Sequence, residues 1–430
     1  MASKEISHLT TTINVGLAMA IQLARKRYET DSCEHPVPYL VSVPGAGKTQ
    51  LLAHLCKQLG YGSESYTLAL KPLEWLTGLP TIINPKDSVT GENSPSVKWL
   101  RPEFIDELYE LSSKFEFSIV LLDDFHYCTS GQQAYGYEIF TYHKLHGIDL
   151  PKNVRFVVAG NNSSMSGAKQ IMSAILNRML PITVKPDREY WLENFAYPKR
   201  LNSIVTAFLK NNMHEQYFAE EESSTPYGSP RSWSALAHSI DAISETINLS
   251  ENLDLFHAMA TGSLSKTAAN EFYLFYSIYS KVPVDSIYSS GEWKMPSESE
   301  KYAFIIAITD YVINSIIHFA EKTHFKASEH KDEFAKFQKT LKVYNGIIQK
   351  FHKGDVEMAS LSANTILTNK YEYNYNGKCI TMWNIVKDLM NNNLLSSETL
   401  TSLMATKNKK FEEINNLSNK LLKLAPTTGE

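Results

Sequence analysis

Short apolar runs alternate with helical patterns through the first part of the chain. Three runs rich in β-branched residues predict buried strands at 37–43, 117–122 and 154–159. Apolar residues at helical spacing predict helices at 8–28, after position 50 and at 132–145. Strands that alternate with helices favour a parallel sheet covered on both faces, so we expect an α/β fold here.

After Pro186 the pattern becomes helical. The predicted helices lie at 190–195, 204–209, 232–246, 268–278, 305–319, 331–352, 383–393 and 397–423. A segment rich in Pro, Ser and Gly at 282–297 is the best candidate for a linker between domains. The chain has 430 residues, which at about 150 residues per domain suggests about three domains.

Composition and charge are those of a soluble globular protein. Hydrophobic residues make up 43% of the chain and charged residues 20%, and 42 Lys and Arg against 46 Asp and Glu give a formal charge of −4. This balance excludes a protein that is polybasic as a whole, though not a local basic patch. The four cysteines, Cys33, Cys56, Cys128 and Cys379, lie far apart without a CxxC pair. They indicate reduced thiols in a cytoplasmic protein.

No targeting or membrane segment is expected. The N-terminus lacks the basic-then-apolar pattern of a signal peptide. The most apolar stretch, Ala303–Phe319, is interrupted by Asp310, Asn314 and His318. It therefore falls short of the ~18 apolar residues that a membrane helix needs.

The segment Ser42–Thr49 reads Ser-Val-Pro-Gly-Ala-Gly-Lys-Thr and joins a predicted strand to a predicted helix. Glycines let such a loop curl so that backbone N–H groups surround a phosphate, and the helix adds its positive N-terminal end. We expect Lys48 to reach the β- and γ-phosphates and Thr49 to ligate Mg²⁺. The strict motif has Gly at position 42, but Ser fits there if its φ stays negative. The predicted nucleotide-binding residues are Pro44, Gly45, Ala46, Gly47, Lys48, Thr49 and Gln50.

Two carboxylates follow the predicted strand at 117–122. Asp123 and Asp124 should lie at the carboxyl edge of the sheet, where open α/β folds bind ligands. We expect Asp123 to support Mg²⁺ through a water ligand, and Asp124 to orient or polarise the water that attacks the phosphate. With the phosphate loop, this pair predicts an ATP hydrolase that uses ATP and Mg²⁺.

Over about residues 35–280 the chain resembles the AAA+ ATPases of the MoxR-like family. Leu76–Pro80 and Val97–Phe104 resemble a family insert in the second helix that projects toward a ring pore. Gly147–Pro151 resembles the loop before the family's sensor 1 strand, and Pro186–Trp191 resembles the entry to its helical lid.

The resemblance implies roles for three further residues. Asn161 matches sensor 1, whose amide hydrogen-bonds the γ-phosphate or the attacking water. Arg178 matches the arginine finger, which reaches the nucleotide of a neighbouring subunit and neutralises charge in the transition state. Arg231 matches sensor 2, which contacts the γ-phosphate from the lid. Asp124 stands where the family usually has Glu, which sets its carboxylate about 1.5 Å back, and misplacements of that size can cost ~10²-fold in rate.

The resemblance also implies an architecture and partners. It implies an AAA+ P-loop core at 1–195 and a helical lid at 196–285. The remaining residues, 286–430, match no family segment, and their helical pattern predicts a C-terminal all-helical domain. Subunits would form a homo-oligomer, a hexameric ring with nucleotide at the subunit interfaces, and hydrolysis would remodel or assemble a protein client. Many members of the family work with von Willebrand factor A-domain proteins, so such a protein or another client is the expected partner.

Two other functions stay open. The fold is shared with helicases and initiators, so a nucleic-acid motor or loader is one of them. Lys86, Lys98, Trp99 and Arg101 give the insert a few basic and aromatic side chains that suit such a role. The other is a nucleotide-gated scaffold that binds ATP and hardly hydrolyses it, for which Asp124 is the reason.

Overall fold

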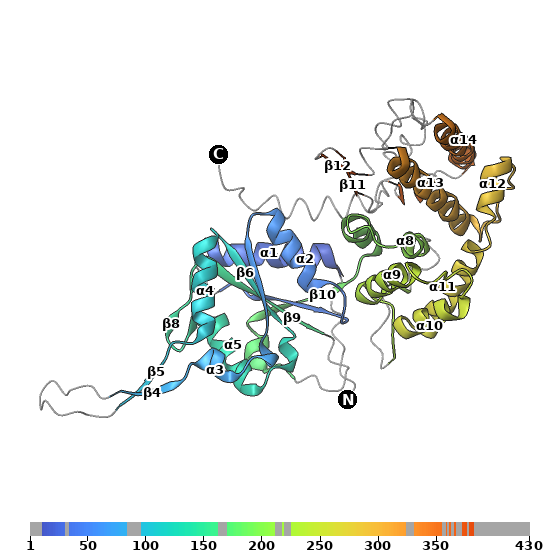
Figure 1. Cartoon of the computed structure of the whole chain (residues 1–430). Coiled ribbons are helices and arrows are strands. Elements are labelled where there is room, and N and C mark those ends of the chain that lie inside the picture. The colour runs from blue at the N-terminus through green and yellow to red at the C-terminus, as the bar shows by residue number, and fades with distance from the viewer. Residues whose placement is uncertain are drawn as a thin grey trace, which may run out of the picture. The chain divides into compact units, whose positions relative to one another are not determined.

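The computed structural model describes residues 11–30, 34–83, 96–161, 170–210, 217–218, 225–323, 331–354, 358, 361–362, 365–366, 372–375 and 378–381. These residues form two compact units, the first running to Pro186 and the second beginning at Asp187. In Figure 1 the first unit is coloured blue to green and the second green to red. The predicted helices at 383–393 and 397–423 lie outside the described residues.

The first unit is an α/β fold with a six-stranded sheet between helices. The strands of that sheet are β1 (Thr11–Thr12), β2 (Val37–Ser42), β3 (Gly62–Thr67), β6 (Ser118–Asp123), β9 (Val154–Asn161) and β10 (Met179–Lys185). The helices are α1 (Ile13–Glu29), α2 (Lys48–Gln58), α3 (Leu73–Thr77), α4 (Glu103–Lys114), α5 (Ser130–Tyr142) and α6 (Ser173–Leu176), with short turns η1 (Leu68–Leu70) and η2 (Phe125–Tyr127). The described part of the unit also contains two hairpins, β4 (Pro80–Ile83) with β5 (Ser96–Trp99) and β7 (Lys144–Leu145) with β8 (Ile148–Asp149).

The six strands lie in the order β1-β10-β2-β9-β6-β3, and every neighbouring pair is parallel. Strand β9 therefore separates β2 from β6. The register sets Ser42, the last residue of β2, opposite Asn161, the last residue of β9. On the other side of β9, Leu122 of β6 is opposite Val158. Parallel strands end at a common edge, so the residues that follow β2, β6 and β9 come together there.

Both faces of the sheet are covered, which explains the apolar runs in the sequence. Successive residues of a strand point to opposite faces. In β6, Ile119 and Leu121 pack in one cluster with residues of α1 and α2, whereas Val120 and Leu122 pack in another with residues of α4 and α5. A strand buried on both sides has no polar face, so its sequence is apolar throughout. The predicted α/β fold with a parallel sheet is confirmed.

The second unit consists mainly of helices within its described residues. They are α7 (Arg188–Trp191), the π-helical turn η3 (Leu192–Ala196), α8 (Ser203–Lys210), α9 (Pro230–Ser244), α10 (Leu253–Ser263), α11 (Lys266–Tyr279), α12 (Val284–Ser290), α13 (Lys301–Thr323) and α14 (Lys331–Gly354). A short antiparallel hairpin, β11 (Glu372–Tyr375) with β12 (Lys378–Thr381), follows them. The predicted helices at 190–195, 204–209, 232–246, 268–278, 305–319 and 331–352 all fall on these helices.

One hydrophobic cluster runs through the second unit from Trp191 to Ile366. The predicted linker at 282–297 is wrong in part, because helix α12 lies within it and buries Ile287 and Tyr288 in that cluster. The Tyr288 hydroxyl also donates a 2.9 Å hydrogen bond to the Ile308 carbonyl. Proline and glycine here mark the ends of a packed helix. The division into a lid at 196–285 and a third domain at 286–430 stays a prediction. The expectation that this third domain is all-helical is wrong, because the backbones of β11 and β12 pair as an antiparallel hairpin within it.

Helix α13 is strongly apolar despite the polar residues Asp310, Asn314 and His318 within it. By length and composition alone, Lys301–Phe319 could cross a membrane, with a mean hydropathy of 1.5. The expectation that no segment meets this requirement is therefore too strict. However, 61% of that window is buried inside the unit, where Ile305, Ile308 and Val312 belong to the hydrophobic cluster. A buried core helix passes the same test of composition as a membrane helix, so the test is weak evidence for a span.

Candidate functional site

The loop between β2 and α2 has the backbone geometry of a phosphate-binding turn. Gly45 and Gly47 have φ values of +77° and +95°, in the left-handed region that glycine adopts without strain. Gly47 is the N-cap of α2, so the unpaired N–H groups of the helix begin directly after it. Such a helix end attracts anions through its N–H groups and its dipole.

The other predicted nucleotide-binding residues lie in the same turn. Ala46 is buried and packs in the cluster that α1 and α2 share with the sheet. Gln50, in the first turn of α2, is exposed to solvent. Lys48 begins the helix and is only 7% exposed, so its ammonium needs polar partners.

Lys48 finds partners at the ends of two strands. Its Nζ donates to the Ser42 hydroxyl at 2.8 Å and to Asn161 Oδ1 at 3.1 Å. These two acceptors are register neighbours on β2 and β9. The lysine of the loop and the predicted sensor residue are therefore in direct contact.

Thr49 and Asp123, both predicted to serve Mg²⁺, also touch each other. The Thr49 hydroxyl donates to Asp123 Oδ2 at 2.5 Å, and the other carboxylate oxygen accepts the Asp124 N–H at 3.0 Å. Among the residues that the structure describes, no group of three or more His, Cys, Asp or Glu side chains is arranged so that it could hold a metal ion. A hydroxyl and one carboxylate beside a phosphate loop still suit Mg²⁺, which is commonly held by one or two carboxylates, waters and substrate phosphates.

Asp124 has an unusual backbone. Its φ and ψ are +53° and +35°, in the left-handed region, which Asp and Asn tolerate better than most residues. This conformation follows directly after β6 and brings the side chain toward the end of β9, where Asn161 Nδ2 donates to Asp124 Oδ1 over a long 3.4 Å. The backbone outlier therefore coincides with the carboxylate that the sequence assigns to water activation.

The structure adds His126, a residue that no sequence motif indicated. Its Nδ1 accepts the backbone N–H of Asn161 at 3.3 Å, which requires the proton to be on Nε2. The side chain is buried. Burial lowers the pKa of His126 and the positive charge of Lys48 lowers it further, against the opposing effects of Asp124 and Asp123. In the sequence, the available signal was a histidine two positions after the Asp pair. Its partner, the Asn161 N–H, could not be identified without knowing where β9 ends in the sheet.

Arg178 does not belong to this cluster. It lies in the turn between α6 and β10, where its guanidinium is held against α5. Its Nε donates to the Thr141 hydroxyl at 2.5 Å and its Nη2 to the Tyr137 hydroxyl at 2.8 Å. The guanidinium carbon also lies 4.0 Å from the centre of the Tyr137 ring, within the range of a cation–π contact.

The register shows how far Arg178 is from the phosphate loop of its own chain. Met179, the next residue, is opposite Val37 at the beginning of β2, whereas the loop starts at Ser42 at the end of that strand. Five strand residues span about 16 Å, since each adds about 3.3 Å. Arg178 is therefore at the opposite edge of the sheet, and its predicted role in a neighbouring subunit stays a prediction.

Arg231 belongs to the second unit. It lies in the first turn of α9, which begins with Pro230, and Ser229 caps this helix by accepting the Ser232 N–H at 3.2 Å. The Arg231 side chain is exposed. Its predicted contact with a γ-phosphate stays a prediction.

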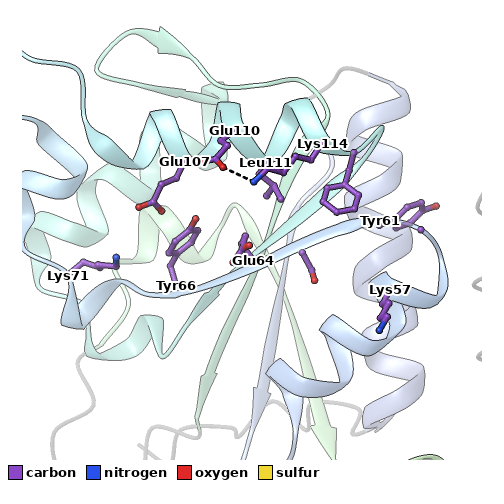
Figure 2. A pocket seen from close by; sticks show the side chains of 12 residues that line it. Lys57, Tyr61, Glu64, Tyr66, Lys71, Glu107, Glu110, Leu111 and Lys114 are labelled. Atoms are coloured by element: carbon purple, nitrogen blue, oxygen red, sulfur yellow. Dashed lines mark hydrogen bonds and ion pairs between the residues drawn. The ribbon is translucent and has the colours of Figure 1, made fainter. Parts of the chain in front are cut away.

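A separate groove of about 660 Å³ lies along the edge strand β3, between α4 and the end of α2. Figure 2 shows Glu110 and Lys114 of α4 joined by an ion pair, and Tyr66 of β3 pointing toward Glu107. Burial raises the pKa of Tyr66, and its hydrogen bond to Glu107 raises it further. Because several of its charged and polar groups pair with one another, the groove is less suited to a charged ligand than the loop between β2 and α2.

No protein-family model matches this chain, and no curated protein matches it significantly. The case for a function therefore depends on the residues and the geometry alone.

Proposed function

We propose that the chain is an AAA+ ATPase of the MoxR-like type, which hydrolyses ATP at the interfaces of a homo-oligomeric ring to remodel or assemble a protein client. The observation that carries the proposal is the cluster at the carboxyl edge of the sheet. It joins Lys48 and Thr49, at the start of α2, to Asn161 and Asp123, the last residues of β9 and β6.

The geometry suits hydrolysis of a nucleoside triphosphate. The N–H groups at the start of α2 would bind phosphate oxygens, and Lys48 would neutralise the β- and γ-phosphates. Thr49 and Asp123 would hold Mg²⁺, which when bound neutralises charge on the phosphates. Asp124 would accept a hydrogen bond from the attacking water, and the Asn161 amide would orient that water or the γ-phosphate.

The hairpin of β4 and β5 supports a protein client. In Figure 1 it projects away from the body of the first unit. It exposes large apolar side chains: Ile82 is 75% exposed, Val97 64% and Trp99 59%. Exposed apolar groups on a projecting element suit contact with protein. The residues between the strands, 84–95, lie outside the described part of the chain.

The same hairpin offers less to nucleic acid. Arg101, which follows β5, is paired with Asp106 at 2.8 Å. The carboxylate offsets the charge that a phosphate backbone would need. We therefore favour remodelling of a protein client over a nucleic-acid motor as the function of this chain.

Asp124 supports a second candidate, a scaffold that binds ATP with little turnover. Its carboxylate reaches Asn161 only at 3.4 Å, and an Asp is shorter than the Glu that the family usually has. Tight ATP binding without turnover in the assembled protein would favour this candidate.

The deciding experiment measures ATP binding and phosphate release by the purified full chain with and without Mg²⁺. We expect Mg²⁺-dependent turnover that Lys48→Ala abolishes. Lys57→Ala is the matched control, because Lys57 is on the same helix but exposed at its far end. Failure of the wild type to bind ATP, or equal losses in the two variants, would contradict the proposal. Turnover stimulated many-fold by DNA or RNA, with a steep dependence on salt, would favour the motor instead.

A further inference from the structure

Ser42 occupies the position where the strict phosphate-loop motif has glycine, and its hydroxyl makes two hydrogen bonds. It accepts a hydrogen bond from Lys48 Nζ at 2.8 Å and donates one to the Val43 carbonyl at 2.9 Å. The side chain is 1% exposed. We infer that Ser42 is a positioning residue, which holds the Lys48 ammonium in place for the phosphates. This inference rests on the proposed ATP site.

The first reason is the chemistry of the lysine. Its ammonium ends a flexible four-carbon stem and donates up to three hydrogen bonds. A glycine at position 42 has no side-chain acceptor, so the serine gives this chain an anchor that the strict motif lacks. The contact is charge-assisted, and such hydrogen bonds are stronger than those between neutral groups. Its donation to Val43 also ties the anchor to the first residue of the loop itself.

The second reason is the contact between Lys48 and Asn161. Lys48 only donates, so the Asn161 amide must present its oxygen, Oδ1, to the ammonium at 3.1 Å. The amide nitrogen, Nδ2, then faces the Asp124 carboxylate, which only accepts. The position of Lys48 thus fixes which way the Asn161 amide is turned. By holding Lys48, Ser42 also sets the orientation of the groups assigned to water activation.

This arrangement predicts two effects of losing the hydroxyl. ATP binding weakens because Lys48 must be ordered at the moment of binding. Turnover of bound ATP slows because the Asn161 amide loses its fixed orientation. A serine that only fills space in β2 would change neither of these, although its removal would lower the thermal stability of the unit.

The test compares Ser42→Ala and Ser42→Gly with wild type. Ser118→Ala is the matched control, because Ser118 is also buried at the sheet, on β6, and its hydroxyl has no hydrogen-bond partner in the described part of the chain. For each full-length protein we would measure the thermal unfolding midpoint, the Kd of Mg²⁺-ATP by calorimetry, and kcat and KM from phosphate release.

We expect both Ser42 variants to bind ATP about tenfold more weakly and to show a kcat about tenfold lower, as for loss of one charged hydrogen bond. Ser118→Ala should match the wild type in Kd and kcat. Wild-type Kd and kcat in folded Ser42→Ala or Ser42→Gly, or tighter ATP binding by either, would overturn the role of Ser42 and leave the ATPase proposal intact. A wild type that binds no ATP would overturn both.

Discussion

The Thr49 hydroxyl donates a 2.5 Å hydrogen bond to Asp123 Oδ2, although the two residues are 74 positions apart in the chain. Thr49 is in the first turn of α2, and Asp123 ends β6. The contact requires that the phosphate loop and the Asp pair meet at one edge of the sheet. It brings together the two side chains that the sequence assigns independently to Mg²⁺.

Asp123→Asn should weaken the response to Mg²⁺. The amide keeps the size of the side chain but loses the negative charge that attracts the ion or its water ligand. Loss of an outer ligand of this kind typically costs about 10–100-fold in metal affinity or activity. We expect the Mg²⁺ concentration for half-maximal ATP hydrolysis to rise by about that factor, measured by titration at saturating ATP. Asp149→Asn is the control, since that side chain is 78% exposed on β8; an unchanged Mg²⁺ titration of Asp123→Asn would contradict the assignment.

Asp124→Asn should separate binding from hydrolysis. Asn tolerates the left-handed backbone that Asp124 adopts, so the fold and ATP affinity should be kept. The amide is a much weaker base than the carboxylate, and we expect kcat to fall about 10²-fold or more, in the range of general acid–base contributions. Single-turnover phosphate release together with calorimetric ATP binding would show this split. Equal kcat in Asp124→Asn and wild type would remove Asp124 from the mechanism.

The sequence predicted the strands that are buried on both faces and missed others. Runs such as 117–122 and 154–159 are apolar throughout because helices cover both sides. Strand β3, Gly-Ser-Glu-Ser-Tyr-Thr, is polar because it lies at the edge of the sheet. Strand β10 contains Pro181, which weakens any prediction of a strand within a sheet. Whether a strand lies at the edge of a sheet, and whether the sheet tolerates a proline in it, depend on tertiary structure, so local patterns did not reveal β3 and β10.

The residues of the candidate site that belong to sequence motifs were predictable. Lys48, Thr49 and Asp123 follow from residue type and spacing, and the structure brings them to one edge. The partners Ser42 and His126 were not predictable, because their contacts depend on which strand lies beside which. Only the position of β9 next to β2 sets Asn161 beside Lys48.

Arg178→Ala should bind ATP normally but fail to hydrolyse it. In its own chain Arg178 lies at the end of the sheet opposite the phosphate loop. It can therefore contact a nucleotide during catalysis only if that nucleotide is bound by a neighbouring subunit. Loss of an arginine finger typically costs 10³-fold or more in kcat. Phosphate release should therefore be lost in Arg178→Ala alone and in Lys48→Ala alone.

Mixing these two variants tests the contact between subunits. A ring that combines them contains sites in which an intact phosphate loop faces an intact Arg178, so activity should recover. Normal hydrolysis by Arg178→Ala alone would remove the arginine-finger assignment. No recovery in rings shown by native mass spectrometry to contain both variants would argue against action between subunits.

The double variant Ile82→Ser, Trp99→Ser should lose its client while keeping its basal ATPase. Both side chains are largely exposed on the hairpin, at 75% and 59%, so their loss should change the free energy of unfolding by no more than about 0.5 kcal/mol. The measurement is a pull-down from the native source with wild type and variant as paired baits. Leu274→Ser, 53% exposed on α11, is the control for loss of an exposed apolar group. Retention of the same partners by the double variant would exclude the hairpin as the client-binding element.

His126 should make the first unit less stable in mild acid. Its folded pKa is lowered, first by burial, below the unfolded value of about 6.5. The unfolded chain therefore binds the proton more readily, and the stability that neutral His126 provides is present above about pH 6.5 and lost as pH falls through the folded pKa. A protonated ring can no longer accept the Asn161 N–H at Nδ1. His126→Asn keeps an acceptor without titrating, so its denaturant midpoint should fall less between pH 7.5 and 5.5 than that of wild type. His54→Asn, exposed on α2, should follow wild type, and an equal fall in all three proteins would show that His126 does not set this pH dependence.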